Sequence, residues 1–404
     1  MWVIYLQKLQ DKRLVFKGEI TVFLSLIFIL LLSFVGTMVE AASITLTKSM
    51  KRADMALAME SIFAEYEPEL LEKYGIFAKQ GSDLHSISNR LSYYGSGSLE
   101  HEIVNMELLS DMRGQEVYRQ AVISMGGSVS QTNPSILNPY EEEAKSVKEN
   151  FESLGVDVPE LEAVPLSFLL ALVLPKEEVL SNKTINLENL PSKRELRTGI
   201  GDSQKVEKTL FGKGLLASYF TMNFRNYTSK SNADKLSYET EYLLAGKSRD
   251  KDNLEWVAKR LLTIRVAVNY GFLLVDEEKL AKAEAMAIGI STVLAIPEAK
   301  AIIKQAVLFF WSYEESLLDL KKLFLGERVP LGRNEAGSSA DYEDYLRALL
   351  FAADTETLCM RTLDLIELNL GIQVDRCVTK LELESRGYTR RQIPYTCNTS
   401  FAYK

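Results

Sequence analysis

An uninterrupted apolar run occupies residues 20–39, ITVFLSLIFILLLSFVGTMV, and contains no charged side chain. At a rise of about 1.5 Å per residue, a helix of this length spans roughly 30 Å, the thickness of a bilayer's hydrocarbon core. The run therefore predicts a transmembrane helix. Two other interpretations stay open, namely a secretory signal peptide cut after Val39-Glu40-Ala41 and a buried core helix that is apolar all round.

Beyond this run, apolar residues keep recurring in steps of three and four, and no proline occurs before Pro68. One stripe consists of Leu46, Met50, Ala53, Leu57 and Ala64, with Ser61 at the remaining position, and an adjoining stripe consists of Met55, Met59, Ile62 and Tyr66. This spacing predicts an amphipathic helix that continues out of the membrane, followed by a short helix, PELLEKY, that Gly75 ends. Such a helix can pack on its own body or enter a helical assembly.

Downstream, the pattern favours helices together with a small set of strands. Helical spacing covers residues 114–125, 206–224, 253–274, 277–295, 299–326 and 339–371. Strand patterns cover residues 103–108, 236–246, 378–385 and 399–404. Asn253 is the candidate N-cap of one helix, whereas Asp341 and Gly371 mark the start and the end of another. The predicted fold class is α+β: a long N-terminal transmembrane and amphipathic helix, then a mostly helical body with a small antiparallel sheet.

The distribution of charge predicts the topology. The leader, residues 1–19, is short and net basic, while the part after the apolar run is long and acidic. Because basic residues tend to stay on the cytoplasmic side, we expect a cytoplasmic N-terminus and an extracytoplasmic body in a single-pass protein of the cell membrane. The predicted segments are a leader, a transmembrane helix at 20–39, an extracytoplasmic helix at 40–74 and an exported body at 75–404. Turn residues near 126–140 mark a candidate subdivision.

Composition limits the expected partners. The chain has 404 residues and a formal net charge of −8. An acidic body argues against binding to nucleic acid, whose phosphates are bound by clustered Lys and Arg. It also argues against binding to anionic lipid headgroups beyond the anchor. The lipid bilayer around the anchor is therefore the first expected partner.

Motifs of catalysis and of metal binding are missing from the sequence. It contains no GxSxG, HExxH or phosphate-binding loop, and its two histidines lie far from the three cysteines. We therefore predict no catalytic residues, no cofactor and no metal, and a protein that is not an enzyme. In an exported protein, Cys377 and Cys397 are candidates for a disulfide across a C-terminal hairpin, with Cys359 in a helix. Three free thiols are the alternative.

The densest unusual cluster of side chains lies at the start of a predicted helix. Asp341, Tyr342, Asp344 and Tyr345 alternate acidic and aromatic residues there. They could cap and dock the helix, because acidic residues near a helix N-terminus favour its dipole. They are also the candidate for a contact patch with a partner.

Several stretches resemble a known family, among them KGEITVFLSLIFILLLSFVGTMVEAA, MALAMESIFAEYEPELLEKYGIFA, ETEYLLAGK and DYEDYLRALL. This is an uncharacterised family of exported, membrane-anchored proteins of clostridia-like Gram-positive bacteria, whose genes often lie among those for tight-adherence (Tad) pilus assembly. The short basic leader, glycine and long apolar helix are also similar to TadE/TadG-type pseudopilins. Pilin-like precursors are cut after a glycine, which implies processing between Gly18 and Glu19. The glutamate usual at the fifth mature position is replaced here by Phe23.

The resemblance and the anchor together lead to an expected function. We expect an extracytoplasmic structural or assembly component of a Tad-like pilus or secretion system, with proteins of that apparatus as partners. The alternative is a membrane-anchored module that binds a small ligand or an envelope polymer. An anchored enzyme is disfavoured, because the sequence carries no nucleophile, metal or base motif.

Overall fold

The computed structural model describes residues 2–96, 99–126, 174–175, 180–203, 205–229, 235–331, 339–389 and 392–403, with side chains from residue 20 onward except at 95–96. Within them the chain forms two compact units. The first unit comprises Met1–Glu65, Asp83–Asn105 and Lys380–Ala402, and the second comprises Tyr66–Ser82, Met106–Thr379 and Tyr403–Lys404. Two parts of the expected body thus belong with the N-terminal helix. The candidate subdivision near 126–140 falls outside the described residues, except for Gly126.

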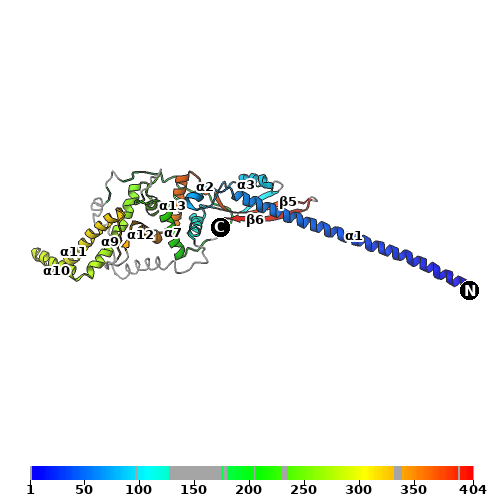
Figure 1. Ribbon diagram of the computed structural model, residues 1–404, viewed down its shortest axis with the longest axis horizontal. Helices are drawn as coiled ribbons and strands as arrows, with labels where there is room; N and C mark the ends of the chain where they lie inside the picture. Colours follow the sequence, from blue (N-terminus) through cyan, green and yellow to red (C-terminus); the bar gives the residue numbers. More distant parts are fainter. Residues whose placement is uncertain are drawn as a thin grey trace. The chain divides into compact units, whose positions relative to one another are not determined.

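The first unit is built around one long helix, α1 (Trp2–Phe63), drawn in blue in Figure 1. It also contains α3 (Leu84–Leu91), the π-helix η1 (Ser92–Ser96), strand β6 (Pro394–Ala402) and most of the strands β2 (Glu100–Leu108) and β5 (Cys377–Tyr388). Strands β5 and β6 pair antiparallel, from Lys380 opposite Ala402 to Tyr388 opposite Pro394. The strand predicted at 378–385 therefore lies within β5, and the one predicted at 399–404 overlaps the end of β6.

The sheet confirms the predicted antiparallel arrangement of strands that are distant in the sequence. Strand order is β1-β5-β2, with β6 also paired to β5, and β1 comprises only Lys79–Gln80. A separate two-stranded sheet joins β3 (Val329–Pro330) to β4 (Ser339–Ala340). Because helices supply nearly everything else, the α+β class predicted from the sequence is correct.

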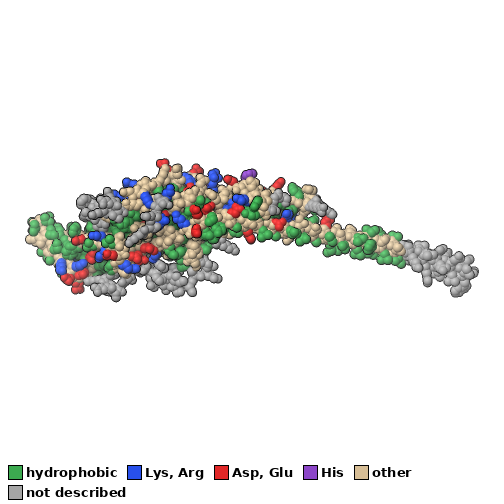
Figure 2. Space-filling model, turned by 45° about the horizontal axis from the view of Figure 1, so that its top comes forward, with side chains coloured by type: hydrophobic (Ala, Val, Ile, Leu, Met, Phe, Trp, Pro, Cys, Tyr) green, Lys and Arg blue, Asp and Glu red, His purple; other side chains and the backbone are tan. Residues whose placement is uncertain are grey.

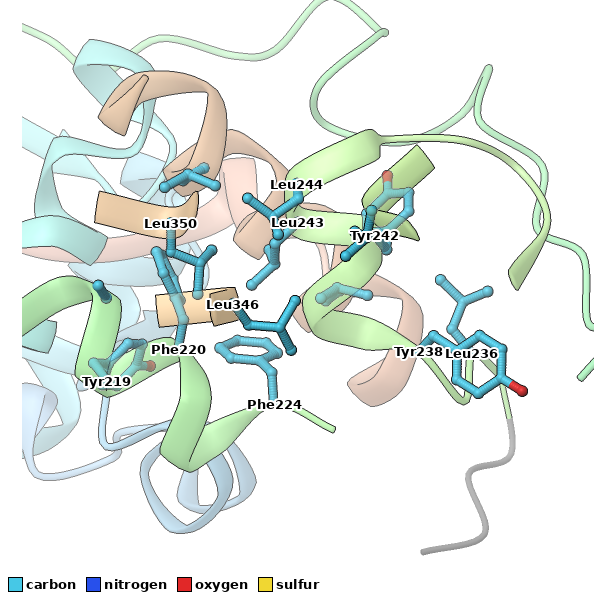
Figure 3. Packing of buried hydrophobic residues seen from close by; sticks show 14 of the residues in the cluster. Tyr219, Phe220, Phe224, Leu236, Tyr238, Tyr242, Leu243, Leu244, Leu346 and Leu350 are labelled. Atoms are coloured by element: carbon cyan, nitrogen blue, oxygen red, sulfur yellow. The ribbon is translucent and has the colours of Figure 1, made fainter. Parts of the chain in front are cut away.

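The second unit is helical. Its helices are α2 (Pro68–Tyr74), α4 (Asp111–Ser124), α7 (Leu210–Asn223), α8 (Glu239–Ala245), α9 (Asp250–Leu274), α10 (Glu277–Val293), α11 (Lys300–Phe324), α12 (Tyr342–Ala352) and α13 (Thr355–Leu370), with short 3-10 turns η4 (Pro297–Ala299) and η5 (Val374–Arg376). One large apolar core joins most of them. Figure 3 shows side chains of α7, α8 and α12 in this core, among them Phe220, Leu243 and Leu346.

Several helix ends follow the local signals in the sequence. Pro68 occupies the first turn of α2, and Gly75 ends that helix with a left-handed φ of 63° that side chains with a Cβ rarely adopt. At α12, Asp341 accepts a hydrogen bond from the Asp344 N–H, and the two residues form a capping box. Gly371 ends α13 as predicted.

Three predictions about secondary structure are wrong. Residues 236–246, predicted as a strand, contain helix α8, in which every residue is buried. The predicted helix at 339–371 is two helices, because the Asp354 side chain accepts from the Thr357 N–H and so starts a new helix after Ala353. Asn253 is not an N-cap: α9 starts earlier, and the Asn253 amide bonds the N–H and the C=O of Lys247 instead.

Candidate functional site

Helix α1 is the one helix among the described residues that is long and apolar enough to cross a membrane. Between Ile20 and Val39 its large apolar side chains are all exposed, and Figure 2 shows green side chains along the visible face of this helix. The hydroxyls of Ser25 and Thr37 donate to backbone carbonyls one turn earlier, at 2.7 and 2.8 Å. Polar groups that are satisfied inside the helix suit a segment surrounded by lipid, where water cannot bond them.

The second predicted stripe of α1 packs on its own unit. Met55, Met59 and Ile62 are buried, and the Phe63 ring stacks on Phe401 of β6 with 4.4 Å between centroids. Met55 also lies against the Ser385 hydroxyl of β5. The last turns of α1 are therefore held by the β5–β6 hairpin along one face.

The first predicted stripe, Leu46, Met50, Ala53, Leu57 and Ala64, is exposed, and we call it the open stripe. Leu46, Met50 and Leu57 are 61, 58 and 63 % exposed, so the described residues leave these side chains largely uncovered. The spacing of four, three and four is that of a seam at which one helix packs on another. Large apolar side chains in such a row are costly in water, and a continuous exposed row marks an interaction surface.

The predicted contact patch at the start of α12 is wrong, because its aromatic members are buried. Tyr342 and Tyr345 lie in the core of the second unit, where the Tyr342 hydroxyl donates to Glu241 at 2.7 Å. Asp341 and Asp344 cap the helix and pair with Arg328. The alternative interpretation of this cluster, a helix cap that docks α12, is the one that the structure contains.

The cysteines do not form the predicted disulfide. All three are free and buried. Strand register places Cys397 opposite Ser385, which is eight positions along β5 from Cys377. Burial raises the pKa of the Cys377 thiol to about 12, so this thiol stays protonated.

Processing between Gly18 and Glu19 stays a prediction. Both residues belong to the stretch of α1 whose side chains lie outside the described residues.

Glu241 is a buried carboxyl group that the sequence analysis missed. Besides Tyr342, it accepts a hydrogen bond from the Tyr227 N–H at 2.8 Å. Burial raises its pKa to about 7, and these two hydrogen bonds only partly oppose that shift. The sequence analysis predicted a strand here and singled out no buried acid. Glu241 links α8 to α12 and makes no contact with open solvent.

A polar pocket of about 220 Å³ lies between α9 and the base of α10 and α11. Arg265, fully buried, forms its inner wall, and Asp276, Lys279, Glu315 and Asp319 contribute the other charges. The three carboxylates of the lining outnumber its two cations, Arg265 being paired with Asp319 at 2.6 Å and Lys279 with Glu315 at 3.5 Å. The pocket therefore suits a small cationic group better than an anion.

Every N–H group of the Arg265 guanidinium donates a hydrogen bond to another group of the protein. Its Nε and Nη2 donate to Asp319, Nη2 also donates to Asn269, and Nη1 donates to the Pro330 carbonyl and the Tyr345 hydroxyl. A buried arginine with every N–H group bonded supports the structure and offers no donor to a ligand. Among the described residues, no group of three or more His, Cys, Asp or Glu could hold a metal ion.

Comparison with known proteins gives one family. A family model described as a family of unknown function (DUF5702) matches residues 157–337 and 332–387, more than half of the chain. The searches of curated proteins and of solved structures gave no significant match. The matched region covers helices α7 to α13 and leaves out α1.

Proposed function

This chain belongs to the family of unknown function DUF5702, and we propose that it is a single-pass, membrane-anchored structural component that assembles with other proteins through α1. The open stripe carries this proposal. It begins a few residues after the apolar run 20–39 and continues along the same helix, with Ala64 directly after the helix ends at Phe63. In the proposed topology the leader is cytoplasmic, residues 20–39 cross the cell membrane, and the body is extracytoplasmic.

Helix packing along the open stripe supplies enough free energy to hold an assembly together. Burying one Leu or Met side chain contributes about 1.5–3 kcal/mol. Leu46, Met50 and Leu57 would together contribute several kcal/mol to each contact with a neighbouring helix. Because both helices would already be confined to one membrane, part of the entropy cost of association is met before contact. The partner is therefore expected to be an α-helix that leaves the same membrane beside α1.

The finer proposal is a Tad-like pilus or secretion system. It rests on the similarity of the leader and the apolar helix to TadE/TadG-type pseudopilins, together with the absence of catalytic motifs from the sequence. On this proposal the chain has no enzymatic role, and purification from its native membrane should retain pilus ATPase or platform proteins.

The test of the open stripe compares two substitutions on opposite faces of α1. Leu57→Lys places a charge in the open stripe, whereas Lys48→Glu changes an exposed charge on the opposite face. We expect Leu57→Lys to weaken association about tenfold or more, because it removes about 1.5–3 kcal/mol of burial and adds a charge that needs water. Native gel electrophoresis of membranes solubilised in mild detergent measures the shift between assembled and free chain.

Cross-linking gives a second measurement of the same surface. A thiol introduced by Met50→Cys should react with a neighbouring subunit in native membranes, while one introduced by Arg52→Cys should not. The native thiols are buried and do not compete. Recovery of the full-length chain from the soluble fraction, or equal behaviour of the Leu57→Lys and Lys48→Glu variants, would contradict the proposal.

The polar pocket supports a second candidate function, an anchored binding module. Its acidic lining favours a small ligand that carries a cationic group. Glu315→Gln would then reduce binding of small amines, measured by calorimetry, while association through α1 stays intact. The pocket is a weaker argument than the open stripe, because its buried arginine is already saturated by protein groups.

A further inference from the structure

Helices α10 and α11 form a hairpin closed by η4, at one end of the second unit (Figure 1). We call residues 285–299 together with Ile302 the hairpin tip. Between residues 285 and 299, Glu298 is the only charged side chain. Apolar side chains gather at this end of the hairpin in Figure 2. Such a tip is unusual for a helix pair exposed to water, where the outer face is normally polar.

Helix α10 has small residues on its buried side and large apolar residues outside, while α11 contributes the buried Leu308 to the contact. On α10 the buried positions are Ala283, Ala287 and Ser291, spaced by four, and Ala283 packs in a cluster with Leu308 of α11. The exposed large apolar residues of the tip are Met286, Ile288, Ile290, Val293, Leu294, Ile296 and Ile302. Val293 is 86 % exposed and Ile302 is 73 % exposed. In water the hydrophobic effect drives the largest apolar side chains inward, so this arrangement is inverted.

Lipid is the environment in which this inverted arrangement is normal. Helices surrounded by acyl chains gain nothing by hiding leucine or isoleucine from one another. They approach through small residues repeated every four positions and leave the large side chains outside. The spacing of Ala283, Ala287 and Ser291 follows that rule. A groove on another protein would also cover the tip, but it would not explain why the buried side of α10 is built from alanine and serine.

Polar groups of the tip are bonded within the tip. The hydroxyls of Ser291 and Thr292 both donate to the Ile288 carbonyl, at 3.0 and 2.7 Å. Through the turn, the N–H groups of Ala295 and Ile296 donate to the carbonyls of Thr292 and Ser291. Groups satisfied in this way can leave water at little cost.

Charged side chains flank the hairpin tip, and their positive and negative charges are equal in number. Glu284 of α10 pairs with Lys300 and Lys304 of α11, each at 2.8 Å. Their ammonium groups lower the pKa of Glu284 to about 2, so these pairs persist at any physiological pH. Lysines and glutamates are equal in number over residues 277–304. Attraction of the tip to a surface would therefore come from its apolar side chains and not from net charge.

We propose that the hairpin tip inserts into the interface of a lipid bilayer as a membrane contact separate from α1. Insertion is shallow. The uncharged end of α10, residues 285–293, is roughly 13 Å long and cannot cross a hydrocarbon core of about 30 Å. Glu298 lies at the level of the headgroups, where its carboxylate keeps its water. The proposal goes beyond the assembly function, and its site shares no residue with the open stripe.

The test measures the environment of the tip directly. The full chain carrying Val293→Cys is reconstituted into phosphatidylcholine vesicles and labelled with an environment-sensitive fluorophore, since the native thiols are buried. We expect a blue-shifted emission that is quenched about twofold or more by spin-labelled phosphatidylcholine, placed either in the host vesicle or in added protein-free vesicles. The same label at Lys321→Cys, exposed at the other end of α11, should keep its aqueous emission.

Three further comparisons separate insertion from other causes of shielding. Leu294→Asp in the labelled chain should abolish the quenching, whereas Leu325→Asp, at an exposed leucine directly after the far end of α11, should not. Glu298→Gln should increase quenching, because it removes the one charge of the tip. Raising the salt concentration to 1 M should change little, since charge attraction would be screened but apolar insertion would not.

Two results would overturn the proposal. In the first, the label at position 293 stays open to iodide and untouched by lipid-borne quencher in either vesicle population. In the second, its emission shifts only as protein density rises and lipid quencher has no effect, which would assign the tip to a contact between protein chains. Neither result depends on whether α1 assembles with a partner.

Discussion

The two ends of helix α11 differ in whether their large apolar side chains are buried or exposed. At its C-terminal end, Leu320 and Leu323 lie in the main core with α9, as in any water-soluble helix pair. At its N-terminal end, the hairpin interface contains alanines, and Ile302 is exposed. If the hairpin tip inserts into lipid as proposed, one continuous helix passes from a core formed in water to a contact with the bilayer. Apolar content alone does not identify a core, because what matters is which residues face inward.

The largest expected effect comes from a matched pair of truncations on α11. Leu320→Ala should lower the free energy of unfolding of the second unit by about 2–5 kcal/mol, because it leaves a cavity in a packed core. Ile302→Ala should change it by less than about 0.5 kcal/mol, because the side chain contacts little protein. Urea denaturation of the detergent-solubilised chain, followed by tryptophan fluorescence, measures both. Similar losses for the two variants would remove the distinction between the two ends of the helix.

A carboxyl group in the core should respond to pH in the opposite sense from one near the tip. Burial raises the pKa of Glu241 in the folded state to about 7, above its usual 4.5. Its contribution to stability is thus fully present below about pH 4.5 and is lost as the pH rises through about 7. Glu241→Gln cannot ionise, so we expect it to be more stable than the native chain above pH 7, by at most about 3 kcal/mol.

The control for that comparison is Glu284→Gln. The folded-state pKa of Glu284 is lowered to about 2, so its ion pairs stabilise the hairpin above pH 4.5 and are lost only as the pH falls through about 2. Between pH 5 and pH 8 the free energy of unfolding of Glu241→Gln should therefore approach that of the native chain as the pH falls. The free energy of unfolding of Glu284→Gln should differ from that of the native chain by a constant amount over the same range. A constant difference for Glu241→Gln would contradict the burial of that charge.

The smallest expected effect tests the alanine interface of the hairpin. Ala287→Leu should overpack the contact between α10 and α11 and destabilise the hairpin locally by about 1–3 kcal/mol. Ile288→Leu, on the exposed neighbouring position, should have no measurable effect. Hydrogen exchange of the α10 and α11 amides, followed by mass spectrometry, reports the local change. Unchanged exchange in Ala287→Leu would mean that the two helices are not closely packed there.

Features that depend on a few neighbouring residues could be predicted from the sequence. The apolar run 20–39 has the length of a membrane span and lies in α1 as expected. Pro68, Gly75, Asp341 and Gly371 mark helix ends through local backbone geometry and hydrogen bonds, and each does so in the structure. Such signals survive folding because their energy depends on residues within one turn of the chain.

Features that depend on residues distant in the sequence could not be predicted from it. Helix α8 was predicted as a strand, because it is buried on all sides and its apolar residues carry no helical period. The pairing of Cys397 with Ser385 depends on strand register, which the spacing of cysteines does not encode. Glu241 is buried with the rest of α8, and its hydrogen-bond partners Tyr342 and Tyr227 come from distant parts of the chain.

The sequence contained both apolar stripes of α1 but gave no means of ranking them. Periodicity places Met59 on one stripe and Leu57 on the other, with equal hydrophobic character. Packing of the β5–β6 hairpin buries the stripe that contains Met59 and leaves the open stripe, which contains Leu57, exposed. The same holds for the hairpin tip, whose apolar residues look like core until α11 is seen to contact the alanines between them. Local chemistry therefore specified the helices, while burial, a property of the whole packed chain, selected which of their faces remain available for binding.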